Sequence, residues 1–254
     1  MARFSTACRG QSLRVTLQVM PAIQNLLLLP GLLCDARLWR DTLALLDGTV
    51  APHIADLTLD DTVHAMARRA LQEAPDRFAL AGLSMGGYVA LEVMRQAPER
   101  VTHLALFDTS ARPDNEDTAR RRRGLMALSR RGQFKGVTPR LLPSLLHPDA
   151  VDGPLSDEVR AMADRVGHEA FLRQQLAILQ RPDSRPILPG IRQPALVAVG
   201  EADILTPPDL AEEMAAALPQ ATLARIRLAG HLPTMEQPEI CAGLMREWLT
   251  RESV

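Results

Sequence analysis

Cysteine, aromatic side chains and net charge are all scarce in this chain of 254 residues. Its cysteines, Cys8, Cys34 and Cys241, are far apart, odd in number and without metal-ligand spacing. We therefore expect free thiols in a reducing, cytoplasmic compartment, with no disulfide framework and no metal site. A formal net charge of −1 supplies no field that would attract nucleic acid or a membrane surface.

Long apolar runs are also missing. No stretch approaches the roughly 18 to 20 apolar residues that span a bilayer, so we expect no membrane association. Hydrophobic residues nevertheless make up 46% of the chain and aromatics only 3%, which predicts a mainly aliphatic core. The length suits one α/β domain with an insertion. Residues 1–22 carry arginines but no hydrophobic targeting core, and we expect a flexible or edge-strand extension without a function.

Short apolar runs alternate with helical patterns along most of the chain. Strands are expected at 25–29, 50–55, 78–81, 101–107, 194–199 and 222–228, and helices at 38–46, 60–71, 87–93, 209–217 and 238–249. This alternation predicts an α/β fold with a mostly parallel sheet covered by helices on both faces. In the closing helix, Ile240, Leu244 and Trp248 are expected to face the sheet.

The alternation stops between the fourth and fifth expected strands. This segment is helix-like, interrupted by prolines, and holds one long amphipathic pattern from Val159 to Phe171. We therefore divide the chain into an extension (1–22), a core (23–111 and 191–254) and a helical cap (112–190).

The segment G-L-S-M-G at 82–86 follows an apolar strand and precedes a helical pattern. G-x-S-x-G in that setting is a nucleophile elbow, a turn so tight that its serine adopts a strained backbone conformation. Gly82 and Gly86 leave room where a Cβ would strike a neighbour. We expect Ser84 to be a nucleophile, with the Met85 N–H directed at a developing oxyanion.

A nucleophilic serine needs a base, and the base needs an acid to orient it. His231 follows the last expected strand, and Asp203 lies in the loop after the strand before it. The order Ser, Asp, His is that of the elbow enzymes. Glu201, in the same loop, and Asp108, at the end of the fourth strand, remain alternative acids.

The second oxyanion donor should come from the loop after the first strand. Gly31 would let that loop turn its amides inward, and the Leu32 N–H is our candidate. Leu33, Leu83 and Leu205 are the residues expected to contact substrate.

These motifs together carry a family resemblance. They are Pro30-Gly31 with Trp39, G-L-S-M-G-G at 82–87, Gly200 with Asp203, and Gly230-His231 followed by Glu236, Pro238 and Glu239. Over about residues 24–251 the chain resembles the α/β-hydrolase superfamily, and more narrowly its small capped esterases and lactonases, such as carboxylesterases, pimeloyl-carrier methyl esterases and 3-oxoadipate enol-lactonases.

The resemblance implies cofactor-free ester hydrolysis through an acyl-enzyme. The chain departs from the family in two respects. Leu29-Pro30 stands before Gly31 where the family usually has His-Gly, so other hydrogen bonds must hold the oxyanion loop. The family's first two antiparallel strands are also largely missing before Asn25, which leaves a sheet reduced at its N-terminal edge.

We therefore expect a serine-dependent carboxylic ester hydrolase acting on a small-molecule ester, with a lactonase as the nearest alternative and oligomeric state open. A non-catalytic binding protein on the same scaffold is the alternative from another class. A dehalogenase is disfavoured because its nucleophile would be an aspartate. Arg120–Arg123 are interpreted as a solvated helix face or, if functional, as an anion hook for a carboxylate-bearing substrate.

Overall fold

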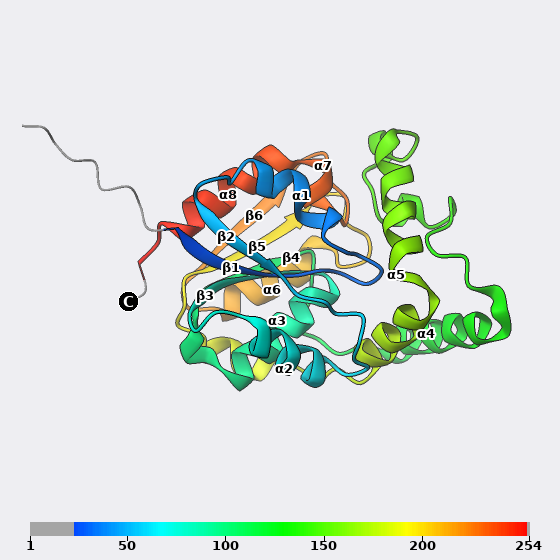
Figure 1. The fold of residues 1–254 in the computed structure, drawn as a ribbon, viewed down its shortest axis with the longest axis horizontal. Coiled ribbons are helices and arrows are strands. Elements are labelled where there is room, and N and C mark those ends of the chain that lie inside the picture. Colours follow the sequence, from blue (N-terminus) through cyan, green and yellow to red (C-terminus); the bar gives the residue numbers. More distant parts are fainter. Residues whose placement is uncertain (1–22, 253–254) are drawn as a thin grey trace, which may run out of the picture.

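The computed structural model describes residues 23–252. Its centre is a sheet of six strands, all parallel, in the order β2-β1-β3-β4-β5-β6 (Figure 1). The strands are β1 (Gln24–Leu29), β2 (Val50–Ile54), β3 (Phe78–Leu83), β4 (Val101–Phe107), β5 (Ala195–Gly200) and β6 (Ala221–Ile226). The expected α/β fold is therefore confirmed. Among residues 23–252 the sheet begins in sequence with β1, and no antiparallel strand precedes it.

Helices cover both faces of the sheet (Figure 1). They are α1 (Arg37–Ala44), α2 (Val63–Glu73), α3 (Met85–Gln96), α6 (Pro208–Ala217), α7 (Pro233–Glu236) and α8 (Pro238–Leu249), with a short 3-10 turn η1 (Pro98–Arg100). Leu27 and Leu29 of β1 belong to a buried cluster that includes residues of α2, α3 and α6, whereas Leu26 and Leu28 belong to one that includes residues of α1, α7 and α8. Because alternate side chains leave opposite faces of a strand, one apolar run supplies both cores.

The closing helix corrects one expectation. In α8 the buried residues include Cys241, Met245 and Trp248, while Ile240 is 43% exposed. At about 100° per residue, positions 241, 245 and 248 lie within about 60° of one another, whereas 240 and 248 are about 80° apart. Trp248 is thus confirmed as a core residue and Leu244 packs against the same cluster, whereas Ile240 lies off the face that contacts the sheet.

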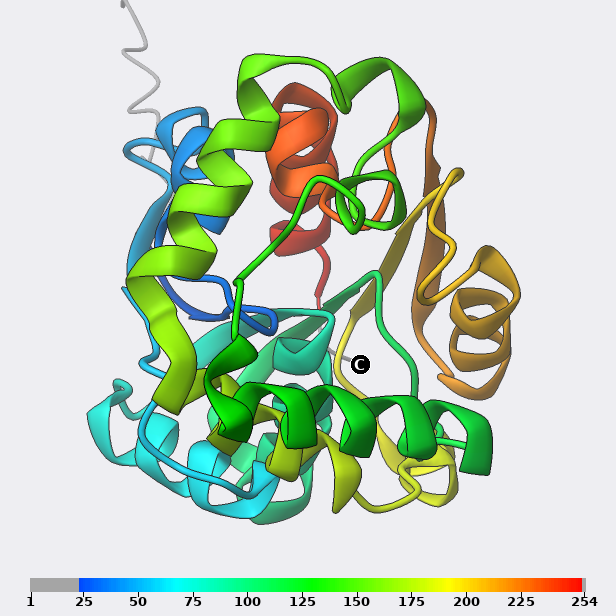
Figure 2. The ribbon, with the colours of Figure 1, turned by 90° about the vertical axis from the view of Figure 1, so that its right-hand side faces the viewer.

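Residues 112–190, called the insertion from here on, join β4 to β5. They contain α4 (Glu116–Leu128), η2 (Ser129–Gln133), η3 (Leu142–Ser144), η4 (Pro148–Ala150), α5 (Pro154–Leu179) and η5 (Arg185–Gly190). Figure 2 looks onto α4 and α5 in front of the sheet. The long amphipathic pattern lies in α5, but Gly167 has a φ of +78° and breaks it into two helical runs.

Within residues 23–252, no helix has the length and apolar character needed to cross a membrane. The expected extension at 1–22 and Cys8 lie outside the described residues.

The contact between α3 and β1 yields a stability prediction. A Cβ at Gly86 would lie 2.6 Å from the Leu29 carbonyl carbon, whereas a Cβ at Gly124, on the exposed side of α4, would meet nothing within 4 Å. We expect Gly86→Ala to lower the free energy of unfolding by about 2 kcal/mol or more. Gly124→Ala should raise it by up to about 1 kcal/mol. Urea unfolding measures both, and equal effects would contradict the packing described here.

Candidate active site

Ser84 lies on the turn between β3 and α3. Its backbone has φ +55° and ψ −116°, a conformation that non-glycine residues rarely adopt. The Ser84 N–H donates to the Phe107 carbonyl (3.0 Å), and the Thr109 hydroxyl donates to the Ser84 carbonyl (2.7 Å). A Cβ at Gly82 would collide with the Gly86 carbonyl group. The strained serine turn is thus held by the strand beside it and by two close-packed glycines.

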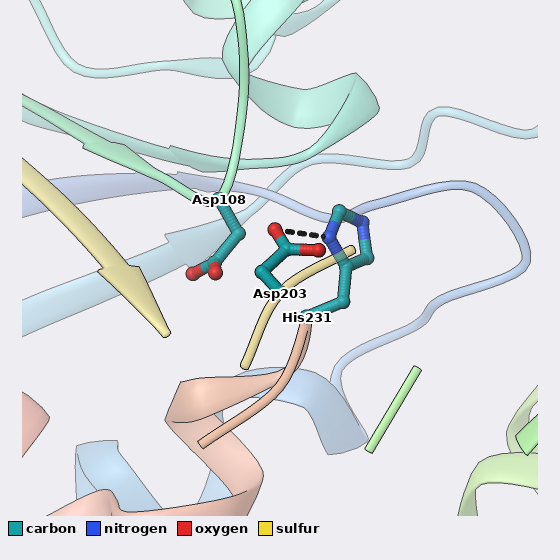
Figure 3. Close-up of side chains that lie close together, drawn as sticks. All are labelled: Asp108, Asp203 and His231. Carbon is teal, nitrogen blue, oxygen red and sulfur yellow. Dashed lines mark hydrogen bonds and ion pairs between the residues drawn. The ribbon is translucent and has the colours of Figure 1, made fainter. Parts of the chain in front are cut away.

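Three of the residues that we expected to act together lie in one hydrogen-bonded chain. The Nε2 atom of His231 is 2.8 Å from the Ser84 Oγ, and its Nδ1 is 2.8 Å from Asp203 Oδ2. With the ring proton on Nδ1 donated to the carboxylate, Nε2 can accept the serine proton. Figure 3 shows the Asp203 carboxylate directed at the imidazole.

Asp203 is held in place by its own loop. Oδ1 accepts from the backbone N–H groups of Leu205 (2.8 Å) and Thr206 (3.2 Å), and Oδ2 accepts from the Thr206 hydroxyl (2.6 Å). Burial opposes ionisation, but attraction to His231 and these hydrogen bonds outweigh it and lower the pKa of Asp203. The group is therefore suited to remain a carboxylate beside the imidazole.

Asp108, the alternative acid, lies beside Asp203 rather than against the imidazole (Figure 3). Its Oδ1 accepts from the Gly200 N–H (2.8 Å), and its buried Oδ2 has no hydrogen-bond partner among residues 23–252. Burial, and then the charge of Asp203, raise the pKa of Asp108 well above its ordinary value. Between the two acids, the hydrogen bond to His231 favours Asp203. Glu201, the other alternative, is exposed.

One carboxylate holds the histidine loop to the insertion. Glu236 accepts from the backbone N–H groups of Gly230 (2.8 Å), Leu232 (3.3 Å) and His147 (2.5 Å). The His231 N–H itself donates to the carbonyl of Leu145 (3.0 Å). Glu236 had a place in the sequence motif but no assigned role. Its role depends on the backbone of the insertion, which no local pattern locates.

The expected oxyanion loop is also held from the insertion. Gly31 lies against the nucleophile, since a Cβ there would be 3.5 Å from that of Ser84. The Leu33 N–H donates to Gln174 Oε1 of α5 (3.0 Å), and Gln174 Nε2 donates to the carbonyl of Leu57 (3.2 Å). Gln174 thus supplies hydrogen bonds to a loop that lacks the family's His-Gly. Oxyanion binding by the Leu32 and Met85 amides stays a prediction.

The expected substrate contacts occupy different settings. Leu33 is buried and packs with Ala163 and Phe171 of α5. Leu83 is fully buried in the core on the α1 and α8 side. Leu205 is 49% exposed, beside Asp203 in sequence. Contact of these residues with substrate stays a prediction.

The cysteine near the oxyanion loop is poorly suited to act as a second nucleophile. Burial, and then the charge of Asp35, raise the pKa of the Cys34 thiol to about 12. Because the thiolate is the reactive species, this thiol is inert at neutral pH.

Asp108, Asp203 and His231 also offer potential metal ligands, with one atom from each lying within 4.8 Å of the others. The direct hydrogen bond between Asp203 and His231 already uses two of these groups. The absence of a metal and of a cofactor stays a prediction.

The arrangement as a whole defines a class of protein. A serine on a turn between a strand and a helix, an acid after a later strand and a histidine after the last strand, on one parallel sheet, are the marks of an α/β hydrolase.

Comparison with known proteins agrees. The model of the alpha/beta hydrolase family matches residues 26–244. A pimeloyl-[acyl-carrier protein] methyl ester esterase of Aromatoleum aromaticum is 32% identical over 199 residues, covering 73% of this chain and 79% of that protein. The chain belongs to the alpha/beta hydrolase family.

Solved structures show the same architecture. A thermophilic esterase from Thermogutta terrifontis is 30% identical, with a TM-score of 0.81 over 91% of each chain. An enol-lactonase from Burkholderia xenovorans LB400 has a TM-score of 0.80 at 22% identity, covering 90% of this chain and 91% of that one, and shares the fold.

The contacts of Gln174 yield a prediction. Gln174→Ala removes the partners of two backbone groups, so we expect faster hydrogen exchange at the Leu33 amide and about 1–3 kcal/mol less stability. Gln180→Ala, at the exposed end of α5, is the matched control and should change neither. Exchange followed by NMR tests this, and an unchanged Leu33 rate would remove Gln174 as the support of the loop.

Proposed function

We propose that this protein is a serine hydrolase that cleaves carboxylic esters through an acyl-enzyme. The observation that carries the proposal is the hydrogen-bonded chain from Ser84 Oγ through His231 to Asp203, at 2.8 Å for each step. The Aromatoleum aromaticum relative and the Thermogutta terrifontis structure are both described as esterases, which supports the same reaction class.

The reaction follows from this geometry. Ser84 Oγ attacks the ester carbonyl carbon while His231 Nε2 takes the hydroxyl proton. The imidazolium is stabilised by Asp203, and it returns the proton to the departing alcohol. The amides of Met85 and Leu32 stabilise the oxyanion, each contributing a few kcal/mol. Water activated by His231 then releases the acid and frees Ser84.

The insertion serves as a cap over this site. It contacts the loops after β1, β2 and β6 through Gln174 and through the Leu145–His147 backbone. Among the predicted substrate contacts, Leu33 packs directly against α5 of the cap. A lactone places the same acyl carbon in a ring, so lactone opening remains the alternative reaction at these residues.

A covalent probe tests the serine assignment. We expect a fluorophosphonate to label the wild-type protein and Ser144→Ala, a control on η3, but not Ser84→Ala. Ser84→Ala should also lower kcat on p-nitrophenyl esters by about 10⁵- to 10⁶-fold. Wild-type protein that neither labels nor turns over esters would favour the non-catalytic binding protein. Faster turnover of lactones than of esters of matched acyl length would favour the lactonase.

A more specific substrate is a methyl ester carried on an acyl-carrier protein, as the name of the Aromatoleum aromaticum relative suggests. One surface feature of this chain favours a protein-bound substrate. Arg121, Leu125 and Leu128 are exposed on α4 at positions i, i+4 and i+7, and each leucine is 47% exposed. Arg121 gives this face a positive charge that would attract an acidic carrier. At about 100° per residue, Arg120 and Arg123 lie about 100° and 160° round the helix from Arg121, and Arg120 pairs with Asp117 (3.0 Å). Arg122 instead points inward, to Asp114 (2.8 Å) and Gln175 (2.5 Å).

Reversing charge on this face separates the two kinds of substrate. We expect Arg121→Glu to raise KM for a carrier-bound methyl ester about tenfold, equivalent to about 1.4 kcal/mol of binding. The variant should leave KM for a p-nitrophenyl ester within twofold. Arg68→Glu, at an exposed position of α2, is the control. Equal effects on both substrates, or an equal effect of the control, would rule out carrier docking at α4.

A further inference from the structure

The site holds a second carboxyl group that the proposed mechanism does not use. Asp108 directly follows β4, is fully buried and has a φ of +42°. Its N–H donates to the Ala198 carbonyl (2.9 Å), so the turn is fixed by β5. Residues held in such backbone conformations cluster at functional sites, which makes the contacts of this side chain worth following.

The surroundings of Asp203 stabilise a negative charge better than those of Asp108 do. Asp203 is the acceptor from two backbone amides, one hydroxyl and the imidazole. Asp108 accepts from the Gly200 amide, while its Oδ2 is buried without a partner among residues 23–252. An ionised carboxylate with an unsatisfied buried oxygen is strongly disfavoured, whereas a carboxylic acid is far less so.

The charged groups that face Asp108 also oppose its ionisation. Asp203 lies beside it in the loop after β5, and Glu236 of α7 contributes further negative charge. The Cys241 thiol of α8 is buried close enough to feel the charge of Asp108. His231 is the group that turns cationic in the reaction, and it lies on the far side of Asp203 (Figure 3). Atoms of Asp108, Asp203 and His231 nevertheless lie within 4.8 Å of one another.

We propose that Asp108 and Asp203 form a pair that carries one negative charge, with Asp108 as the protonated member and a reserve positioning residue for His231. While Asp203 is ionised, the Asp108 proton turns toward the Asp203 carboxylate and partly neutralises it. When Asp203 is replaced by alanine, its repulsion is removed and the imidazole becomes available as a partner for the Asp108 Oδ2, and together these changes offset the burial that opposes ionisation of Asp108. Asp108 then ionises and takes over the orientation of the imidazole. This inference rests on the proposed serine mechanism.

A double-mutant cycle tests the pair. Asp108→Asn keeps the acceptor for the Gly200 amide and should lower kcat/KM only about two- to fivefold. Asp203→Ala opens the space between Asp108 and the imidazole. Because the reserve acid remains, it should lower kcat/KM about 10²-fold. The double variant should approach the roughly 10⁴-fold loss expected when no acid orients the histidine. Asp203→Ala and the double variant share any damage to the Leu205–Thr206 loop, so their ratio isolates Asp108.

Infrared spectroscopy gives a reading that needs no activity. At neutral pH, wild-type protein should show the carbonyl band of a neutral carboxylic acid that disappears in Asp108→Asn. In Asp203→Ala the same band should be lost, because Asp108 becomes a carboxylate there. The infrared measurement applies even if the protein hydrolyses no ester. A wrong proposed function can therefore be told apart from a wrong assignment of the proton to Asp108.

Either of two results would overturn the proposal. One is equal kcat/KM, within about threefold, for Asp203→Ala and the double variant. The other is a wild-type spectrum without a band that depends on Asp108. If Asp203→Ala does not fold, the comparison of wild type with Asp108→Asn still decides whether Asp108 is protonated.

Discussion

The close approach of α3 to β1 is the constraint on which the site depends. Gly86 packs against the Leu29 carbonyl group, and only then can the chain turn from β3 into α3 within one residue. Ser84 accepts a φ of +55° because its neighbours on both sides are fixed in this way. Since β3, β4, β5 and β6 are consecutive in the sheet, the loops at their ends meet above this turn. Residues far apart in sequence thereby reach hydrogen-bond distance.

The chemistry of the site is governed by how it distributes buried charge. Three carboxyl groups lie near His231 or its loop, and the surroundings of Asp108, Asp203 and Glu236 affect their ionisation differently. Hydrogen bonds and His231 lower the pKa of Asp203 despite burial. Burial raises the pKa of Glu236 although three amides donate to it, and that of Asp108 most of all. One carboxylate beside the histidine is enough to stabilise an imidazolium. Further negative charges at this place would raise the pKa of the neighbouring carboxyl groups, so that these groups would hold their protons more tightly.

Local sequence patterns were sufficient for the strands, the serine turn and the loops that bear Asp203 and His231. Each depends on short-range periodicity and on glycines at close contacts, both visible in a single sequence. Gln174 and Glu236 could not be given roles in this way, because their partners Leu33 and His147 are distant along the chain. The interruption of α5 at Gly167 was also missed, since a glycine inside an apolar helical pattern is often tolerated. The roles of Gln174 and Glu236 and the interruption of α5 all depend on where the insertion lies relative to the core.

The histidine loop is joined to the insertion through backbone atoms of residues 145 and 147, and this limits how the two parts can vary. The Leu145 carbonyl accepts from the His231 amide, and Glu236 binds the amides of His147 and Gly230. Such contacts place little demand on the side chains at 145 and 147. Gln174 differs, because its own side chain holds the Leu33 amide. The side chains at 145 and 147 can therefore change without loss of these hydrogen bonds, whereas Leu146, Val159 and Met162 of the insertion are buried in the core. Position 174 cannot change in the same way unless another group supports the loop after β1.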